Sequence, residues 1–207
     1  MNGQTEQKLW PENVIVADAD YVDHVAFHLI VNFERMLNRR IPKADMAQWI
    51  VCIGLDGGMR PTENAETSTQ VILLHDKQHT CLENFLPADY SQELNGQAFR
   101  DERLGEFQIA ATEVESNLVT RDDLLLDIVG TVLARPEVKR VMIVPNAEEG
   151  TLYDDLRETL RRHDADDKRV TVFTMEPLQG GRFQQEMLGY SLTAALGIRG
   201  EELGSEK

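Results

Sequence analysis

Cysteine is scarce in this sequence of 207 residues, and its two copies, Cys52 and Cys81, have no C-x-x-C spacing. Two cysteines are too few for a disulfide framework, and their separation excludes the common zinc and redox motifs. Long apolar runs are also missing, since no stretch approaches the roughly 18 apolar residues of a membrane span. The N-terminal residues lack the basic start and apolar run of a signal peptide. We therefore expect a soluble, cytoplasmic protein with reduced thiols and no membrane partner.

Basic residues are outnumbered, because 21 Lys and Arg stand against 36 Asp and Glu and give a formal net charge of -15. This charge repels phosphate polyanions, so nucleic acid is disfavoured as a partner unless cations cluster locally. Two basic clusters are interleaved with acids, which is typical of solvated surfaces. They comprise Arg39, Arg40 and Lys43, and Arg157, Arg161, Arg162, Lys168 and Arg169. Apolar content is ordinary at 42% and predicts a packed globular domain.

Short apolar runs alternate with helical patterns along most of the chain. The runs that predict strands lie at 13–17, 49–55, 71–74, 106–111, 138–144 and 170–174. Helical periodicity predicts helices over 22–37, 120–133 and 146–163. Alternation of this kind indicates crossover units on a sheet. The sequence therefore predicts a three-layer α/β fold, Rossmann-like or PIN-like, with a mostly parallel sheet and helices on both faces.

The length fits a single domain, which we place at residues 13–199. We expect a flexible N-terminus at residues 1–12 and a flexible tail at residues 200–207. The chain has no internal repeat and no low-complexity tract between these ends.

Two segments depart from the alternation of strand and helix. Residues 76–105 are expected to form a small antiparallel insertion, because Asn95-Gly96 is a hairpin turn signal. An apolar stripe at helical spacing predicts a C-terminal helix over residues 183–197. That helix either caps its own domain or contacts another chain. A homo-oligomer or a protein partner bound through this helix is therefore the predicted assembly.

Acidic residues follow several of the predicted strands. Parallel strands end at one edge of the sheet, where helix N-termini converge, so acids at these ends are candidates for one shared site. Mg²⁺ and Mn²⁺ take oxygen ligands. The candidate metal ligands are Asp18, Asp20, Asp122, Asp123, Asp127 and Glu149. Helix capping is the alternative role for these acids, because cap spacing pairs Asp20 with Asp23, Thr120 with Asp123 and Asn146 with Glu149.

Two segments, together with the order of elements, resemble the NYN/PIN-like nuclease domains. They are Thr120-Arg121-Asp122-Asp123-Leu124-Leu125-Leu126-Asp127 and Val141-Met142-Ile143-Val144-Pro145-Asn146-Ala147-Glu148-Glu149. Members of that family are metal-dependent ribonucleases with a parallel sheet. The resemblance implies Asp18, Asp123 and Asp127 as catalytic residues that hold Mg²⁺ or Mn²⁺, with Glu149 as a further acid. Ala147 stands where the first Asp of the family's turn after the later strand would be.

Three functions are compatible with these patterns. The missing carboxylate and the negative net charge favour a catalytically silent descendant of the fold that binds a protein partner or self-associates. A Mg²⁺- or Mn²⁺-dependent NYN/PIN-like ribonuclease is the alternative. The segment Val14-Ile15-Val16-Ala17-Asp18-Ala19-Asp20-Tyr21-Val22 resembles the first motif of haloacid-dehalogenase-type phosphotransferases. That resemblance implies a second alternative, in which Asp18 is the covalent nucleophile.

Histidines offer a separate candidate for zinc. His24 and His28 are one helical turn apart with Asp20 on the same side, and His75 and His79 repeat the spacing. The first pair lies on the polar stripe of its predicted helix, which is typical of solvated surface. Both interpretations stay open from sequence.

Overall fold

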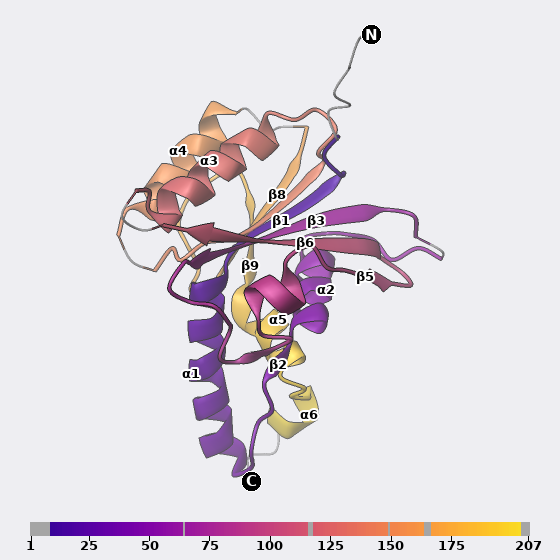
Figure 1. Cartoon of the computed structure of the whole chain (residues 1–207), viewed down its shortest axis with the longest axis vertical. Helices are drawn as coiled ribbons and strands as arrows, with labels where there is room; N and C mark the ends of the chain where they lie inside the picture. Colours follow the sequence, from indigo (N-terminus) through magenta and orange to yellow (C-terminus); the bar gives the residue numbers. More distant parts are fainter. Residues whose placement is uncertain (1–8, 64, 116–117, 149, 164–166, 204–207) are drawn as a thin grey trace.

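The computed structural model describes residues 9–63, 65–115, 118–148, 150–163 and 167–203. Its centre is a sheet of seven strands in the order β5-β6-β3-β1-β7-β8-β9 (Figure 1). The strands are β1 (Asn13–Asp18), β3 (Ser68–Asp76), β5 (Ala98–Asp101), β6 (Gly105–Val114), β7 (Arg140–Val144), β8 (Arg169–Thr174) and β9 (Gln184–Met187). Neighbouring strands pair in parallel except β5 and β6, which are antiparallel. The sheet is therefore mostly parallel with a small antiparallel part, as predicted.

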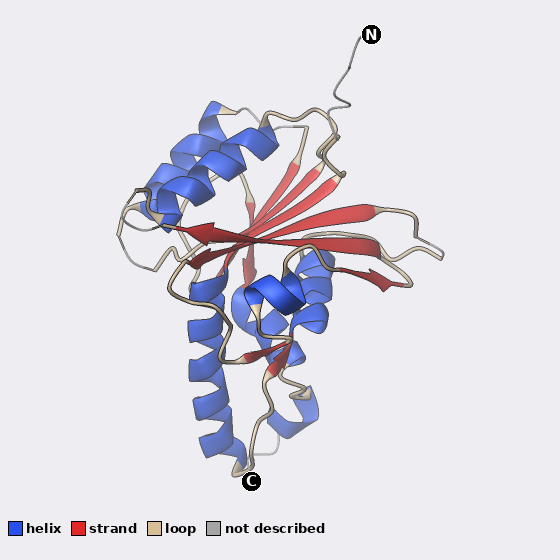
Figure 2. Ribbon diagram, in the orientation of Figure 1, coloured by secondary structure: helices blue, strands red, loops and turns tan. Residues whose placement is uncertain are grey.

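Helices cover both faces of the sheet (Figure 2). One layer contains α1 (Ala19–Leu37), α2 (Met46–Asp56) and α5 (Leu188–Ala195), and the other contains α3 (Arg121–Leu133) and α4 (Leu152–Arg162). Alternate side chains of each buried strand point to opposite layers. In β1, Ile15 and Ala17 pack with the first layer, whereas Val14 and Val16 pack with the second. The predicted three-layer α/β fold is confirmed.

The strand order changes direction at β1. From β1 the chain proceeds to β3 and β6 on one side, and it then crosses through α3 to β7, β8 and β9 on the other side. Loops that leave β1 and β7 diverge at this point, and open parallel sheets bind ligands in the crevice that such loops form. Asp18 ends β1 here and caps α1, because its carboxylate accepts a hydrogen bond from the Tyr21 N–H at 3.0 Å.

Residues 49–55 are helical, so the prediction of a buried strand is wrong. They belong to α2, which Asp45 caps by accepting a hydrogen bond from the Gln48 N–H. The buried side chains recur at helical spacing and are Met46, Trp49, Ile50 and Ile53. Because α2 is packed between the sheet and α5, it has little polar face, and a short apolar run of this kind resembles a buried strand.

The insertion at 76–105 is ordered, but its turn is not where the sequence placed it. It contributes β4 (Phe85–Leu86), which pairs with β2 (Ala44–Asp45), and a π-helix at Tyr90–Leu94. Asn95-Gly96 ends that π-helix instead of joining two strands. The antiparallel hairpin is the one formed by β5 and β6, which reverses at residues 102–104.

The C-terminal segment at 183–197 contains a strand before its helix. β9 occupies the edge of the sheet, and only α5 is helical. The apolar stripe of α5 is buried in its own domain through Leu188, Leu192 and Ala195. The short helix α6 (Gly200–Leu203) follows, within the expected tail. No helix in the described part of the chain is both long and apolar enough to cross a bilayer.

Helix α4 begins later than the sequence predicted. It starts at Leu152, with Thr151 as the preceding residue, so Asn146 lies outside it and does not cap it. The proposed cap pair of Asn146 with Glu149 is therefore wrong at its first member. Glu149 itself lies outside the described residues.

Candidate functional site

The guanidinium of Arg121 lies against two carboxylates at the carboxyl edge of the sheet. Its Nε is 3.5 Å from Oδ2 of Asp18, and its Nη1 donates to Oδ2 of Asp20. Arg121 is the first residue of α3, whereas the two acids lie where β1 passes into α1. The fold thus joins residues 101 positions apart in sequence. A cation that belongs to the protein therefore offsets one of the two negative charges of this acidic pair.

Asp18 is almost fully buried, with 2% of its surface exposed. Burial raises the pKa of its carboxyl above the ordinary value, because a charge is poorly solvated there. Arg121 and the Tyr21 N–H act in the opposite direction, while Asp20 and Asp122 add to the rise. The charged form of Asp18 therefore depends on Arg121.

Asp20 and Asp23 attach the loop after β3 to helix α1. Oδ2 of Asp20 accepts a hydrogen bond from the Asp76 N–H at 2.8 Å, and its Oδ1 is 3.0 Å from Nδ1 of His79. Asp23 accepts a hydrogen bond from the Asn84 N–H, also at 2.8 Å. Asp18, not Asp20, caps α1, so the predicted cap pair of Asp20 with Asp23 is wrong. The two acids instead hold the insertion over the carboxyl edge of the sheet.

Two buried tyrosines border the same edge. The Tyr21 hydroxyl donates to Oε1 of Glu148 at 2.7 Å and so connects α1 to the loop after β7. Tyr90 stacks on His75 with ring centroids 3.7 Å apart, and its hydroxyl has no hydrogen-bond partner among the described residues. Burial, with help from nearby carboxylates, raises the pKa of both phenols. Both tyrosines are therefore neutral at physiological pH.

The acids predicted on α3 have other surroundings. Asp123 is bound to the N-cap residue of α3, because its N–H donates to Oγ1 of Thr120 at 3.0 Å and the Thr120 hydroxyl donates to its carboxylate at 2.7 Å. Asp122 and Asp127 are exposed on the helix. Burial of part of the Asp122 carboxyl raises its pKa, which Arg121 opposes. Among the three acids of α3, Asp122 is the one whose charge helps to raise the pKa of Asp18.

No metal cluster is formed within the described ranges. There, no group of three or more His, Cys, Asp or Glu side chains is placed so that it could hold a metal ion. Asp18 and Asp20 lie together as the sequence predicted, but Arg121 contacts both. Glu148 reaches the edge through Tyr21, whereas the predicted ligand Glu149 lies outside the described residues.

The histidine pairs have separate roles. His24 and His28 are exposed on α1, and their Nε2 atoms are 3.0 Å apart. Asp20 contacts His79 and does not join them, so the three residues do not form the zinc site considered from sequence. His75 is buried against Tyr90.

Arg121 is the residue of the candidate site that sequence reasoning missed. A signal for it was present, because Arg121 is the first residue of a helix and directly precedes Asp122. Cations are unfavourable near helix N-termini, where the macrodipole is positive. An arginine at this position therefore indicates a carboxylate partner that offsets the unfavourable interaction. Its partners could not be identified without the fold, because they follow a strand 101 positions away.

Comparison of the chain with known protein families gave one match. A family model described as "Family of unknown function (DUF6621)" matches residues 7–203. Searches of curated proteins and of solved structures gave no match. The matched range includes β1, α3 and β7, which together form the site.

Proposed function

The chain belongs to the family of unknown function DUF6621, and we propose that it is a catalytically silent NYN/PIN-like domain that acts by binding a protein partner or a second copy of itself. The observation that supports this proposal is the position of Arg121. Its guanidinium takes the carboxylate oxygens of Asp18 and Asp20 that a divalent cation would need. An arginine keeps its charge at all physiological pH values, so it competes permanently with a metal for these oxygens.

Two further features support silence at this edge. Ala147 supplies no carboxylate in the loop after β7. Asp18 is 2% exposed, whereas a covalent nucleophile must be accessible to its substrate. This burial also argues against the phosphotransferase alternative, in which Asp18 would attack a phosphorus atom.

A binding partner can contact only side chains that are exposed on the surface of the domain. The apolar stripe of α5 is buried within the domain, but Tyr190 on the same helix is 74% exposed. Tyrosine is enriched in protein interfaces, because it combines a large apolar ring with a polar hydroxyl. The outward side of α5 around Tyr190 is therefore the part of the C-terminal helix that is available to a partner.

An RNA cleavage assay tests the proposed silence. We expect single-stranded RNA incubated with the purified chain and millimolar Mn²⁺ to stay intact, at the level of an Asp18→Asn variant. Asp154→Asn is the matched control, because it makes the same charge change at an exposed acid on α4. The ribonuclease alternative would be correct if the wild type and Asp154→Asn cleaved RNA and Asp18→Asn did not.

A further inference from the structure

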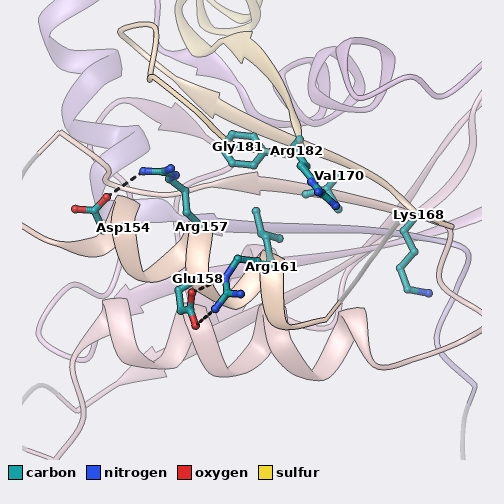
Figure 3. Close-up of a pocket in the computed structure, with 10 residues that line it drawn as sticks. Asp154, Arg157, Glu158, Arg161, Lys168, Val170, Gly181 and Arg182 are labelled. Atoms are coloured by element: carbon teal, nitrogen blue, oxygen red, sulfur yellow. Dashed lines mark hydrogen bonds and ion pairs between the residues drawn. The ribbon is translucent and has the colours of Figure 1, made fainter.

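A cavity of about 640 Å³ lies between α4, the start of β8 and the segment before β9 (Figure 3). Its size is in the range of sites for small organic molecules, which is roughly 300 to 1,000 Å³. We propose that this cavity binds a small organic phosphate that carries an apolar or aromatic group. The inference goes beyond the proposed function and does not depend on it, because the cavity shares no residue with the Asp18 edge.

Three arginines supply the polar side of the cavity. Arg157 is 3.4 Å from Asp154, and Arg161 forms two hydrogen bonds of 2.9 and 2.8 Å with Glu158 (Figure 3). Arg182 is exposed and has no hydrogen bond or ion pair among the described residues. Three guanidiniums therefore face two carboxylates in a protein whose net charge is -15. The excess positive charge favours an anionic ligand.

Lys168 also lines the cavity, but its ammonium is already bound. It donates to the carbonyl oxygens of Arg135 and Val138 at 2.8 and 2.9 Å, after the end of α3. Its side chain is 5% exposed. Lys168 therefore contributes its aliphatic stem to the wall, and the arginines are the groups left for a ligand.

The other side of the cavity is apolar. Leu160, Val170 and Phe183 line it, and all three belong to or pack against the core beneath α3 and α4. An inorganic anion would leave this wall in contact with water. An organic group would cover the wall, and the burial of apolar surface would stabilise the complex. The ligand is therefore expected to be amphipathic.

The segment at residues 179–181, which contributes Gly181 to the wall of the cavity, is held in place by the protein itself. The Tyr153 hydroxyl lies 2.8 and 2.7 Å from the carbonyl oxygens of Gln179 and Gly180, which share its single proton. Gly181 has φ +116, and a Cβ there would lie 2.2 Å from the Phe183 ring, so the segment approaches that ring as only glycine allows. A wall built in advance lowers the entropy lost on binding.

Phosphate suits this arrangement better than other anions. A guanidinium presents planar donors that match phosphate oxygens, and a phosphate monoester carries roughly -1.5 to -2 charges at neutral pH. Arg182 is free to form such a pair, while Arg157 and Arg161 are held by their carboxylates along one wall. A polynucleotide is disfavoured, because Asp154 and Glu158 share this surface and repel a long polyanion.

Isothermal titration calorimetry with 1-naphthyl phosphate tests the proposal, with inorganic phosphate and 1-naphthol as the two halves of the probe. We expect naphthyl phosphate to bind at least about 10-fold more tightly than either half, because inorganic phosphate contacts only the arginine side of the cavity and 1-naphthol contacts only its apolar side. Arg182→Gln should weaken binding by about 10-fold or more, since it removes a hydrogen bond to a charged group. Phe183→Ala should weaken naphthyl phosphate and leave inorganic phosphate unchanged.

Arg103→Gln is the matched control, because it makes the same charge change at an exposed arginine in the β5–β6 turn, at the opposite edge of the sheet. It should bind the probe like the wild type. Both arginines are exposed, so neither change is expected to affect folding. The proposal would be overturned if naphthyl phosphate did not bind at millimolar concentration. Equal weakening by both arginine variants, or no effect of Arg182→Gln, would overturn it as well.

Discussion

Replacing Arg121 with methionine is expected to lower the free energy of unfolding by about 3 kcal/mol, because it leaves a buried carboxylate without its counter-charge. The side chains of Asp18 and Arg121 are 3% and 29% exposed, so water replaces little of the lost interaction. Methionine keeps much of the length and apolar surface of the arginine stem. Denaturant unfolding measures the loss.

Arg161→Met provides the control for this change. Arg161 also pairs with a carboxylate, that of Glu158, but its side chain is 74% exposed. Exposed pairs contribute at most about 1 kcal/mol, so this variant should be close to the wild type. Equal losses in the two variants would mean that Arg121 is an ordinary surface arginine.

The loss caused by Arg121→Met should depend on pH. The pKa of Asp18 is raised in the folded state above its ordinary 3.8, and Arg121 is the main group that opposes the rise. A carboxyl with a raised folded pKa binds its proton more tightly when folded, so stability falls as pH rises from 3.8 through the folded pKa. Without Arg121 the folded pKa rises further. The variant should therefore lose more stability at about pH 7 than at about pH 4, and a loss of the same size at both would contradict this role.

Gly105→Ala is expected to destabilise the domain by about 3 kcal/mol, through backbone strain and a steric clash together. Gly105 begins β6 with φ +91, and a Cβ there would lie 2.1 Å from the carbonyl oxygen of Thr67. That oxygen accepts a hydrogen bond from the Glu106 N–H, so the two segments cannot separate freely. Thermal or denaturant unfolding gives the loss.

Gly96→Ala separates the two causes. Gly96 has φ +75, but a Cβ there would have no atom within 4 Å. Only backbone strain remains, so we expect a loss of about 1 kcal/mol. If both variants were destabilised equally, the clash with Thr67 would not be a cause of the destabilisation in Gly105→Ala.

These two glycines also show why the sequence pattern places the hairpin turn of the insertion at the wrong residues. Asn95-Gly96 has the local chemistry of a hairpin turn, and local chemistry is what a sequence pattern displays. The actual reversal before Gly105 depends on the backbone of Thr67, which passes beside it after folding. The layers and the mostly parallel sheet were predictable because strand and helix alternate along most of the chain, whereas the strand order came only from the structure. The identity of α2 was not, since its burial between sheet and helix removed the polar face that marks a helix.

The candidate site was predictable in the same partial way. The positions of Asp18 and Asp20 at the end of β1 could be inferred, because a strand end and a change of periodicity are visible in sequence. Their contact with Arg121 depends on the crossover that brings α3 beside β1. The basic cluster around Arg157 looked like solvated surface, because Phe183, which lines its cavity, comes from a segment more than 20 residues later in the chain.

Thermal unfolding with and without Mn²⁺ distinguishes an edge filled by a guanidinium from an open metal site. The wild type should unfold at the same temperature in both conditions. Arg121→Ala should unfold at a higher temperature with Mn²⁺, because the freed oxygens of Asp18 and Asp20 can bind the ion and binding stabilises the folded state. Arg161→Ala should not respond. A wild type that Mn²⁺ stabilises, with the effect lost in Asp18→Asn, would show that Arg121 does not occupy the position of a metal.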